Sequence, residues 1–155
     1  MSFEPKIVTF CCNFCSYVAA DTAGTRKSEY PPNVRIVRLS CSGKCDPLYI
    51  LKAFRAGADG VLVTGCRLEQ CHYLKGNYKA VDRVEFLKRV LDEIGFGAER
   101  LHLQFMSAGE PDEFVRAVTD MTARIKALGP NPKFGKKTLS TDWHRLAQIN
   151  EILKD

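Results

Sequence analysis

The feature that most constrains this chain is a regular alternation of short apolar segments and longer amphipathic stretches. The apolar segments are rich in β-branched residues, which is typical of strands, and they lie at residues 6–10, 34–39, 60–64 and 101–106. Capping signals and apolar residues at helical spacing predict helices at residues 46–56, 80–94 and 110–128. Residues 17–26 are rich in alanine but lack a deep apolar face, and we expect a further helix there. This alternation predicts an α/β domain, with a four-stranded parallel sheet covered by helices on both faces.

The strands differ in how apolar they are, and this difference predicts their order in the sheet. Residues 7–10 and 61–64 are apolar almost throughout, as strands buried on both faces usually are. Arg35 and Arg38 interrupt the second segment, and polar residues such as His102 alternate along the fourth. We therefore expect the first and third strands at the centre, in the flavodoxin-like order 2-1-3-4.

Two helix starts carry recognisable local signals. Asp46 is a good N-cap residue and Pro47 suits the first turn of the helix that follows. The pattern Ser107-x-x-Glu110 resembles a capping box and precedes the last of the four predicted helices.

The chain changes character near residue 130, which predicts a boundary. Prolines and a basic stretch at residues 133–137 indicate a linker, and an apolar face that includes Trp143 predicts a short helix after it. We therefore expect an α/β domain over residues 1–130 and a C-terminal helical tail over residues 131–155. This tail either folds back on the domain or docks onto a partner.

Charge and hydropathy exclude several classes of protein. The chain has 23 basic and 18 acidic residues, a net charge of +5, and the basic residues are spread along it. Nucleic-acid binders usually show a concentrated basic stripe, so we expect no nucleic-acid partner. No apolar run is long enough to span a bilayer, and no signal peptide is apparent, so we expect a cytoplasmic protein without a membrane anchor.

The seven cysteines need an explanation, because the cytosol keeps thiols reduced and an odd number cannot pair completely. Five of them fall at or just past the predicted carboxyl ends of three strands, the edge where open α/β sheets bind ligands. The order 2-1-3-4 places the ends of the first and third strands side by side. These five cysteines are Cys12, Cys15, Cys41, Cys66 and Cys71.

Their spacing allows three kinds of chemistry. Cys12 and Cys15 form a C-x-x-C pair, and Cys66 and Cys71 form a second short pair, which suits an iron–sulfur cluster or zinc. A thioredoxin-like dithiol is a third reading, although it would not need the other cysteines. His72 adjoins Cys71 as a further candidate ligand or neighbour. No catalytic triad, carboxylate pair or phosphate-binding glycine motif is apparent, so no catalytic residue is predicted.

Several segments together resemble a known family, the delta subunit of the methyl-viologen-reducing hydrogenase of methanogens. The resemblance covers residues 5–130 and includes Arg83. Its motifs are CNFCSY at residues 12–17, RLSCSGK at 38–44, GADGVLVTGC at 57–66, CHY at 71–73 and GNYKA at 76–80.

The resemblance implies a non-catalytic electron-relay subunit with one [2Fe-2S] cluster. In that family the subunit passes electrons from a hydrogenase or a formate dehydrogenase to the flavin subunit of heterodisulfide reductase, inside a cytoplasmic, electron-bifurcating complex. The family pattern includes all five cysteines, but a [2Fe-2S] cluster needs four ligands. Strand order favours Cys12, Cys15, Cys66 and Cys71, with Cys41 as the contested fifth. A zinc-stabilised structural or docking module remains the alternative.

Overall fold

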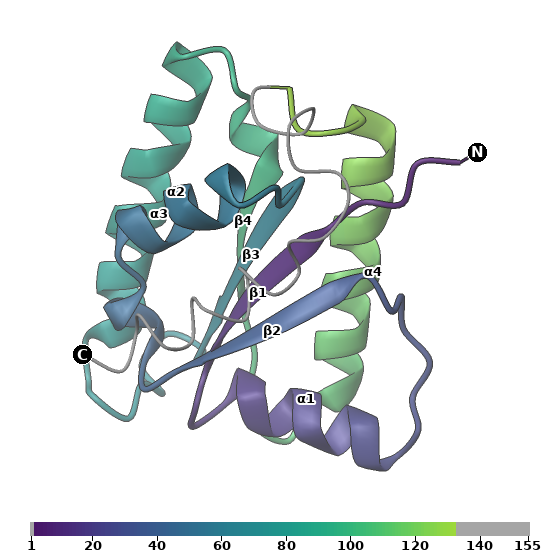
Figure 1. Cartoon of the computed structure of the whole chain (residues 1–155). Coiled ribbons are helices and arrows are strands. Elements are labelled where there is room, and N and C mark those ends of the chain that lie inside the picture. Colours follow the sequence, from purple (N-terminus) through teal and green to yellow (C-terminus); the bar gives the residue numbers. More distant parts are fainter. Residues whose placement is uncertain (1, 133–155) are drawn as a thin grey trace.

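The computed structural model describes residues 2–132, which form a parallel sheet with the order β2-β1-β3-β4 (Figure 1). The fold class and the strand order predicted from the sequence are therefore confirmed. The strands are β1 (Ile7–Cys12), β2 (Val34–Leu39), β3 (Gly60–Gly65) and β4 (Leu101–Phe105). The helices are α1 (Ser16–Thr25), α2 (Pro47–Arg55), α3 (Gly76–Glu93) and α4 (Pro111–Leu128). Two short 3-10 helices are η1 (Ser42–Lys44) and η2 (Ala98–Arg100). The predicted tail helix with Trp143 lies outside the described residues.

Burial explains why the four strands take this order. Every residue of β1 and of β3 is buried, whereas β2 and β4 contain half-buried or exposed positions. All three strand pairs are parallel, and Phe10 of β1 aligns with Val37 of β2 and Val63 of β3. The carboxyl ends of β1, β2 and β3 therefore lie at one edge of the sheet.

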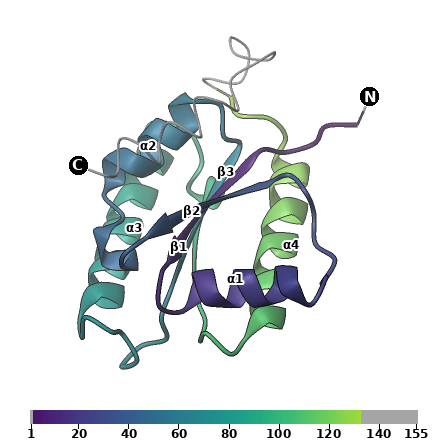
Figure 2. The ribbon, with the colours of Figure 1, turned by 60° about the horizontal axis from the view of Figure 1, so that its bottom comes forward.

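The helices cover the two faces in pairs. One apolar cluster joins β1 and β3 to α2 and α3, and the other joins the opposite face of the sheet to α1 and α4. Figures 1 and 2 show α1 and α4 together on one side and α2 and α3 on the other. Phe114 of α4 and Phe54 of α2 are among the largest fully buried side chains of these two cores.

Element boundaries agree with the sequence where capping is local. Asp46 caps α2 by accepting a hydrogen bond from the Leu48 amide (2.8 Å). The predicted capping box at Ser107 does not form in full. α4 begins at Pro111, and the Ser107 hydroxyl donates to Gln70 of a neighbouring loop and does not cap the helix. The Glu110 half of that pattern does form, because its carboxylate accepts the Ser107 amide proton (2.7 Å).

Buried polar groups stabilise the edge of the sheet that lies opposite the carboxyl ends of the strands. Asn131 is 3% exposed and donates from its side chain to the carbonyls of Phe54 and Ala58. Arg100 donates to the carbonyls of Asp59 and Gly129, which fixes the end of α4. The chain just after α4 therefore remains attached to the domain as far as Asn131.

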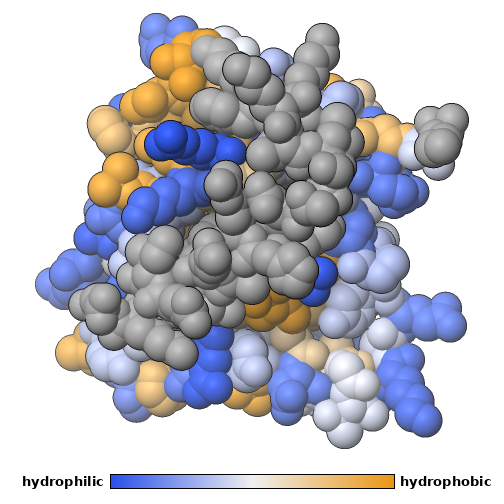
Figure 3. All heavy atoms as spheres, viewed as in Figure 1, coloured by the Kyte–Doolittle hydropathy of each residue, from blue (hydrophilic) through white to orange (hydrophobic). Residues whose placement is uncertain are grey.

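The exposed face in the view of Figure 1 mixes hydrophilic and hydrophobic side chains, with hydrophobic ones on the left over α2 and α3 (Figure 3). Exposed Leu48, Leu51 and Phe86 belong to these two helices. Among the helices in residues 2–132, none combines the length and the hydrophobicity that crossing a bilayer requires.

Candidate metal centre

Five cysteines form a buried cluster at the carboxyl edge of the sheet, and each is at most 8% exposed. Cys12 ends β1 and Cys15 immediately precedes α1, so both come from the centre of the sheet. Cys41 follows β2, whereas Cys66 and Cys71 follow β3. The strand order thus brings together residues that are far apart in the sequence.

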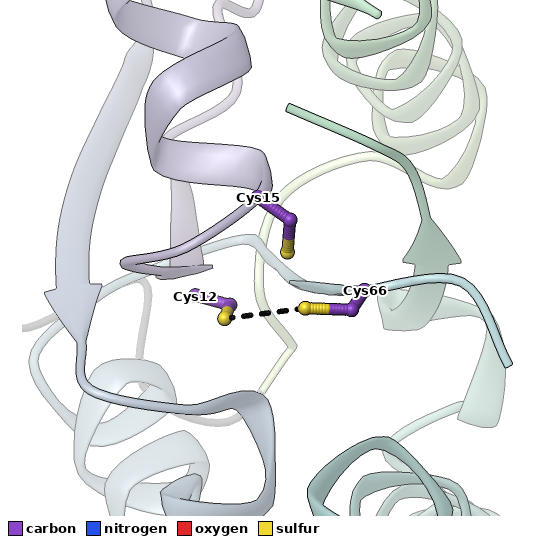
Figure 4. Close-up of side chains that lie close together, drawn as sticks. All are labelled: Cys12, Cys15 and Cys66. Carbon is purple, nitrogen blue, oxygen red and sulfur yellow. Dashed lines mark hydrogen bonds between the residues drawn. The ribbon is translucent and has the colours of Figure 1, made fainter. Parts of the chain in front are cut away.

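Three of these thiols form the tightest group. The sulfurs of Cys12, Cys15 and Cys66 all lie within 4.8 Å of one another, and Cys12 Sγ lies 3.7 Å from Cys66 Sγ. Figure 4 shows the three side chains facing a common space from the end of β1, the start of α1 and the segment after β3. Three convergent cysteine sulfurs are typical ligands of a thiolate metal site.

The other two thiols form a pair, with Cys41 Sγ 4.0 Å from Cys71 Sγ. They meet because η1 packs against the start of α3, where two glycines touch. A methyl group built on Gly43 would lie 2.5 Å from the Gly76 carbonyl oxygen, and one built on Gly76 would overlap Cys41 Sγ. Only residues without a Cβ fit there, so the two glycines make room for the pair.

Backbone N–H groups face several of the sulfurs. The Gly43 amide donates to Cys41 Sγ at 3.4 Å. Such donors stabilise negative charge on sulfur and are common around metal-bound thiolates. The amides of Phe14 and Ser42 also face the Cys12 thiol, and the amide of His72 faces the Cys66 thiol.

The thiols of the cluster differ in acidity. A hydrogen bond with Cys15 lowers the pKa of Cys12 to about 6, and the amide of Phe14 adds to this effect. The pKa of Cys15 is raised, first because its thiol is held protonated by that same bond and then by burial. Burial raises the pKa of Cys41 to about 11. Among Cys12, Cys15, Cys41 and Cys66, Cys12 is therefore the thiol that ionises most readily.

Cys11 and Cys45 lie outside the cluster, within the two apolar cores on opposite faces of the sheet. Burial raises the pKa of each thiol to about 12, so both stay protonated at neutral pH. Neither thiol belongs to the buried group of five.

The segment after β3, which carries Cys66 and Cys71, is held by Asn77 of α3. This side chain is fully buried, and its amide nitrogen donates to the carbonyls of Cys66 (3.1 Å) and Arg67 (2.8 Å). The sequence showed Asn77 only as part of the GNYKA motif, without a role. α3 also begins earlier than predicted, at Gly76.

We expect Asn77→Ala to lower the free energy of unfolding by about 1–3 kcal/mol, because two backbone carbonyls lose their buried donor. It should also weaken metal uptake, since the loop that carries two cysteines loses its anchor. Urea unfolding and metal analysis measure the two effects. Asn131→Ala is the matched control, because Asn131 also donates to two carbonyls but lies at the opposite edge. It should cost similar stability and leave metal uptake intact; equal loss of metal in both variants would contradict this role.

An ion pair links the loop after β3, which carries Cys66 and Cys71, to the start of α4. Arg67 donates from two nitrogens to the Glu110 carboxylate at 2.7 and 2.9 Å. This hydrogen bonding, together with that from the Ser107 amide, lowers the pKa of Glu110 to about 2. The Glu110 carboxylate therefore stays ionised at neutral or mildly acidic pH. The Ser107 hydroxyl also donates to Gln70 of the loop (3.2 Å).

Three aromatic side chains lie at the surface on one side of the five cysteines. The ring of His72 stacks on Phe14, with centroids 3.9 Å apart, and Tyr73 contacts both rings edge-on. A pocket of about 270 Å³ opens beside them and reaches Cys15 and Cys66. The His72 ring therefore stacks on Phe14, and its nitrogens are not among the convergent ligand atoms of Cys12, Cys15 and Cys66.

Ser42 is a residue of the site that the sequence did not single out. It is 1% exposed, and its hydroxyl has no hydrogen-bond partner within residues 2–132. An unsatisfied buried hydroxyl costs about 1–3 kcal/mol, so such groups are rare in folded proteins. The only sequence signal was its place beside Cys41.

The donor set fits a thiolate-bound metal group. Five buried sulfurs, three of them convergent and several faced by amide donors, offer soft anionic ligands and partial charges that stabilise them. The buried hydroxyl of Ser42 fits as well, because a bound group would bring acceptor atoms to it. Soft thiolate ligands of this kind suit iron–sulfur clusters and zinc.

Comparison with known proteins gives a consistent picture. The family model of the methyl-viologen-reducing hydrogenase delta subunit matches residues 7–129. The vhu iron–sulfur subunit of the F420-non-reducing hydrogenase of Methanocaldococcus jannaschii is 54% identical over 129 residues, which cover 83% of this chain and 96% of that protein. The corresponding iron–sulfur subunit of the Archaeoglobus profundus enzyme is 46% identical over 128 residues, 83% of this chain and 93% of that protein.

A larger protein also contains a similar segment. It belongs to the ferredoxin:CoB-CoM heterodisulfide reductase of Methanosarcina mazei, one subunit of which is 41% identical over 126 residues. These residues cover 81% of this chain and only 16% of that protein. A unit like this chain therefore occurs both as a polypeptide of its own and as one part of a longer polypeptide.

Proposed function

Since the chain belongs to the family of the methyl-viologen-reducing hydrogenase delta subunit, we propose that it is an electron-transfer subunit that carries one [2Fe-2S] cluster. It relays electrons from a hydrogenase or a formate dehydrogenase to the flavin subunit of a heterodisulfide reductase, in a cytoplasmic, electron-bifurcating complex of a methanogen. The observation that carries this proposal is the gathering of five buried thiols from three strands.

The proposed ligands are Cys12, Cys15, Cys66 and Cys71. The first three are supported by their mutual distances. Cys71 is preferred over Cys41 as the fourth because it shares a loop with Cys66. That loop follows β3, and the strand order reverses between β1 and β3, where open α/β sheets bind ligands. Cys41 is the contested alternative, since its sulfur lies beside that of Cys71.

The remaining residues of the site hold and shield the cluster. When bound, a [2Fe-2S] cluster supplies one-electron oxidation and reduction at a potential set by its ligands and surroundings. The amides of Phe14 and Ser42, which face Cys12, stabilise the charge on that thiolate. The stacked rings of Phe14 and His72 limit the access of water, and the pocket beside them brings Cys15 and Cys66 close to the surface.

Relatives support the choice of partners. The similar proteins that stand alone are named as iron–sulfur subunits of hydrogenases, which favours a hydrogenase as one neighbour. The similar segment within a longer polypeptide of heterodisulfide reductase favours that polypeptide as the other neighbour. Two units fused in one organism commonly work together as separate chains in another.

The relay is tested with purified components under anaerobic conditions. The cluster of this protein should be reduced by the organism's hydrogenase with H₂, or by its formate dehydrogenase with formate. It should then be reoxidised when the flavin-bearing chain of the reductase is added, as followed by visible absorbance. A cluster that neither donor reduces, or that the reductase chain leaves reduced, would contradict the relay.

A second candidate is a zinc-stabilised structural or docking module, which the compact group of Cys12, Cys15 and Cys66 also suits. It predicts a colourless protein with one bound zinc and no redox signal. Metal analysis of protein purified from its natural host separates the two candidates, because zinc and iron are measured in the same sample.

A further inference from the structure

The hydroxyl of Ser42 is a polar group of the site to which the proposed function assigns no role. The side chain is 1% exposed, and its oxygen is closed to solvent, so bulk water does not satisfy it. No donor or acceptor among residues 2–132 satisfies it either. Buried hydroxyls in proteins nearly always have a hydrogen-bond partner. Among residues 2–132, Thr9 within β1 and Asn33 before β2 also carry a buried side-chain oxygen without a partner, but Ser42 adjoins Cys41 in the cysteine site. Its hydroxyl therefore points to a partner that binds there.

The residues around the Ser42 hydroxyl indicate what kind of partner it would bind. A methyl group built on Gly65 would lie 2.5 Å from the Ser42 oxygen, so the hydroxyl packs against the residue that precedes Cys66. The backbone amide of Ser42 faces the Cys12 thiol, and the preceding residue is Cys41. The hydroxyl therefore lies at the end of β3, on a residue whose own amide faces the Cys12 thiol and which directly follows Cys41.

A nearby serine shows the usual arrangement for comparison. Ser16 is equally buried and also adjoins a cysteine, but its hydroxyl is 3.3 Å from the Thr64 carbonyl oxygen and 3.5 Å from that of Cys12. Backbone acceptors therefore satisfy Ser16, whereas Ser42 has none within reach among the described residues. The difference marks Ser42 as the hydroxyl that remains available to a bound group.

We propose that the Ser42 hydroxyl donates a hydrogen bond to a sulfur of the bound cluster and thereby raises the reduction potential of that cluster. This inference rests on the proposed function, because it requires the cluster. Reduction adds one electron, and the negative charge on the sulfurs increases, while the serine proton stays on its oxygen. A donor bonds more strongly to the more negative sulfur, so it stabilises the reduced state more than the oxidised state. Ser42 acts here as a positioning and tuning residue.

The test is the reduction potential of the intact protein, measured by EPR-monitored titration of wild type and Ser42→Ala. Iron and sulfide should be unchanged in the variant, because no ligand is removed. At the wild-type midpoint the ratio of reduced to oxidised cluster should fall about tenfold, a shift of about 59 mV to more negative potential. Ser16→Ala, which removes an equally buried hydroxyl, should leave the potential unchanged.

Ser42→Thr keeps the hydroxyl and distinguishes hydrogen bonding from packing. It should retain a potential near that of wild type, and it should retain the cluster even if Ser42→Ala loses it. An unchanged potential in a Ser42→Ala variant with full iron and sulfide would overturn the role of Ser42 alone. Equal effects of alanine and threonine would overturn it too. A wild-type protein without iron and sulfide would instead contradict the proposed function, and the role of Ser42 with it.

Discussion

Cys66→Ala is expected to abolish the cluster, with iron and sulfide falling at least about tenfold and the brown colour lost. Cys66 belongs to the tightest group of thiols, and its sulfur lies 3.7 Å from that of Cys12. Changes to residues that merely support a metal ligand already lower metal affinity about 10–100-fold, and loss of a ligand should do more. Iron and acid-labile sulfide per chain, measured after anaerobic reconstitution, check the effect.

The matched control is Cys45→Ala, which removes a cysteine that is just as buried but lies in the core beneath α2 and α3. It should keep full iron and sulfide. The same measurement on Cys41→Ala and Cys71→Ala decides the fourth ligand. We expect loss with Cys71→Ala and retention with Cys41→Ala. The reverse result would replace Cys71 by Cys41, and a full cluster in Cys66→Ala would contradict the ligand set.

Gly76→Ala is expected to have the second-largest effect, because the added methyl group would overlap Cys41 Sγ and lie 3.1 Å from Cys71 Sγ. At least one of the two sulfurs must move. Overpacking of this kind typically costs about 1–3 kcal/mol of stability. We therefore expect a lower unfolding midpoint in urea together with a severalfold loss of iron and sulfide.

Gly24→Ala provides a control in which the added methyl group should raise the stability of the protein. Gly24 lies within α1, and a methyl group built there meets nothing within 4 Å. Alanine is favoured over glycine in a helix by about 0.5–1 kcal/mol, so this variant should be slightly more stable and keep its cluster. If Gly76→Ala behaves like Gly24→Ala, the glycine contact does not shape the cysteine site.

The architecture was predictable because burial leaves a direct mark on composition. A central parallel strand is apolar throughout, as residues 7–10 are, whereas an edge strand keeps charges such as Arg35 and Arg38. Element ends were less predictable where distant residues compete. The Ser107 hydroxyl bonds to Gln70, which is far from it in the sequence, and this contact overrides the local capping pattern.

The candidate site was predictable as far as its cysteines, because topology alone places strand ends together. Cys12, Cys41 and Cys66 lie at or just past the ends of three neighbouring strands, so a correct strand order brings them to one edge. The supporting residues depend on contacts between separate loops. Nothing local marks Asn77 as the anchor of the Cys66 carbonyl, or Ser42 as an unsatisfied hydroxyl. The choice between Cys41 and Cys71 stays a prediction.

The central claim is that this chain holds one [2Fe-2S] cluster on cysteines, and the most direct measurement is the EPR spectrum of the anaerobically purified, dithionite-reduced protein with its iron and sulfide content. The claim predicts about two irons and two sulfides per chain, with a diamagnetic oxidised state and a spin-one-half signal on reduction by one electron. A colourless protein that contains zinc and gives no signal, or one without iron and sulfide after reconstitution, would contradict it.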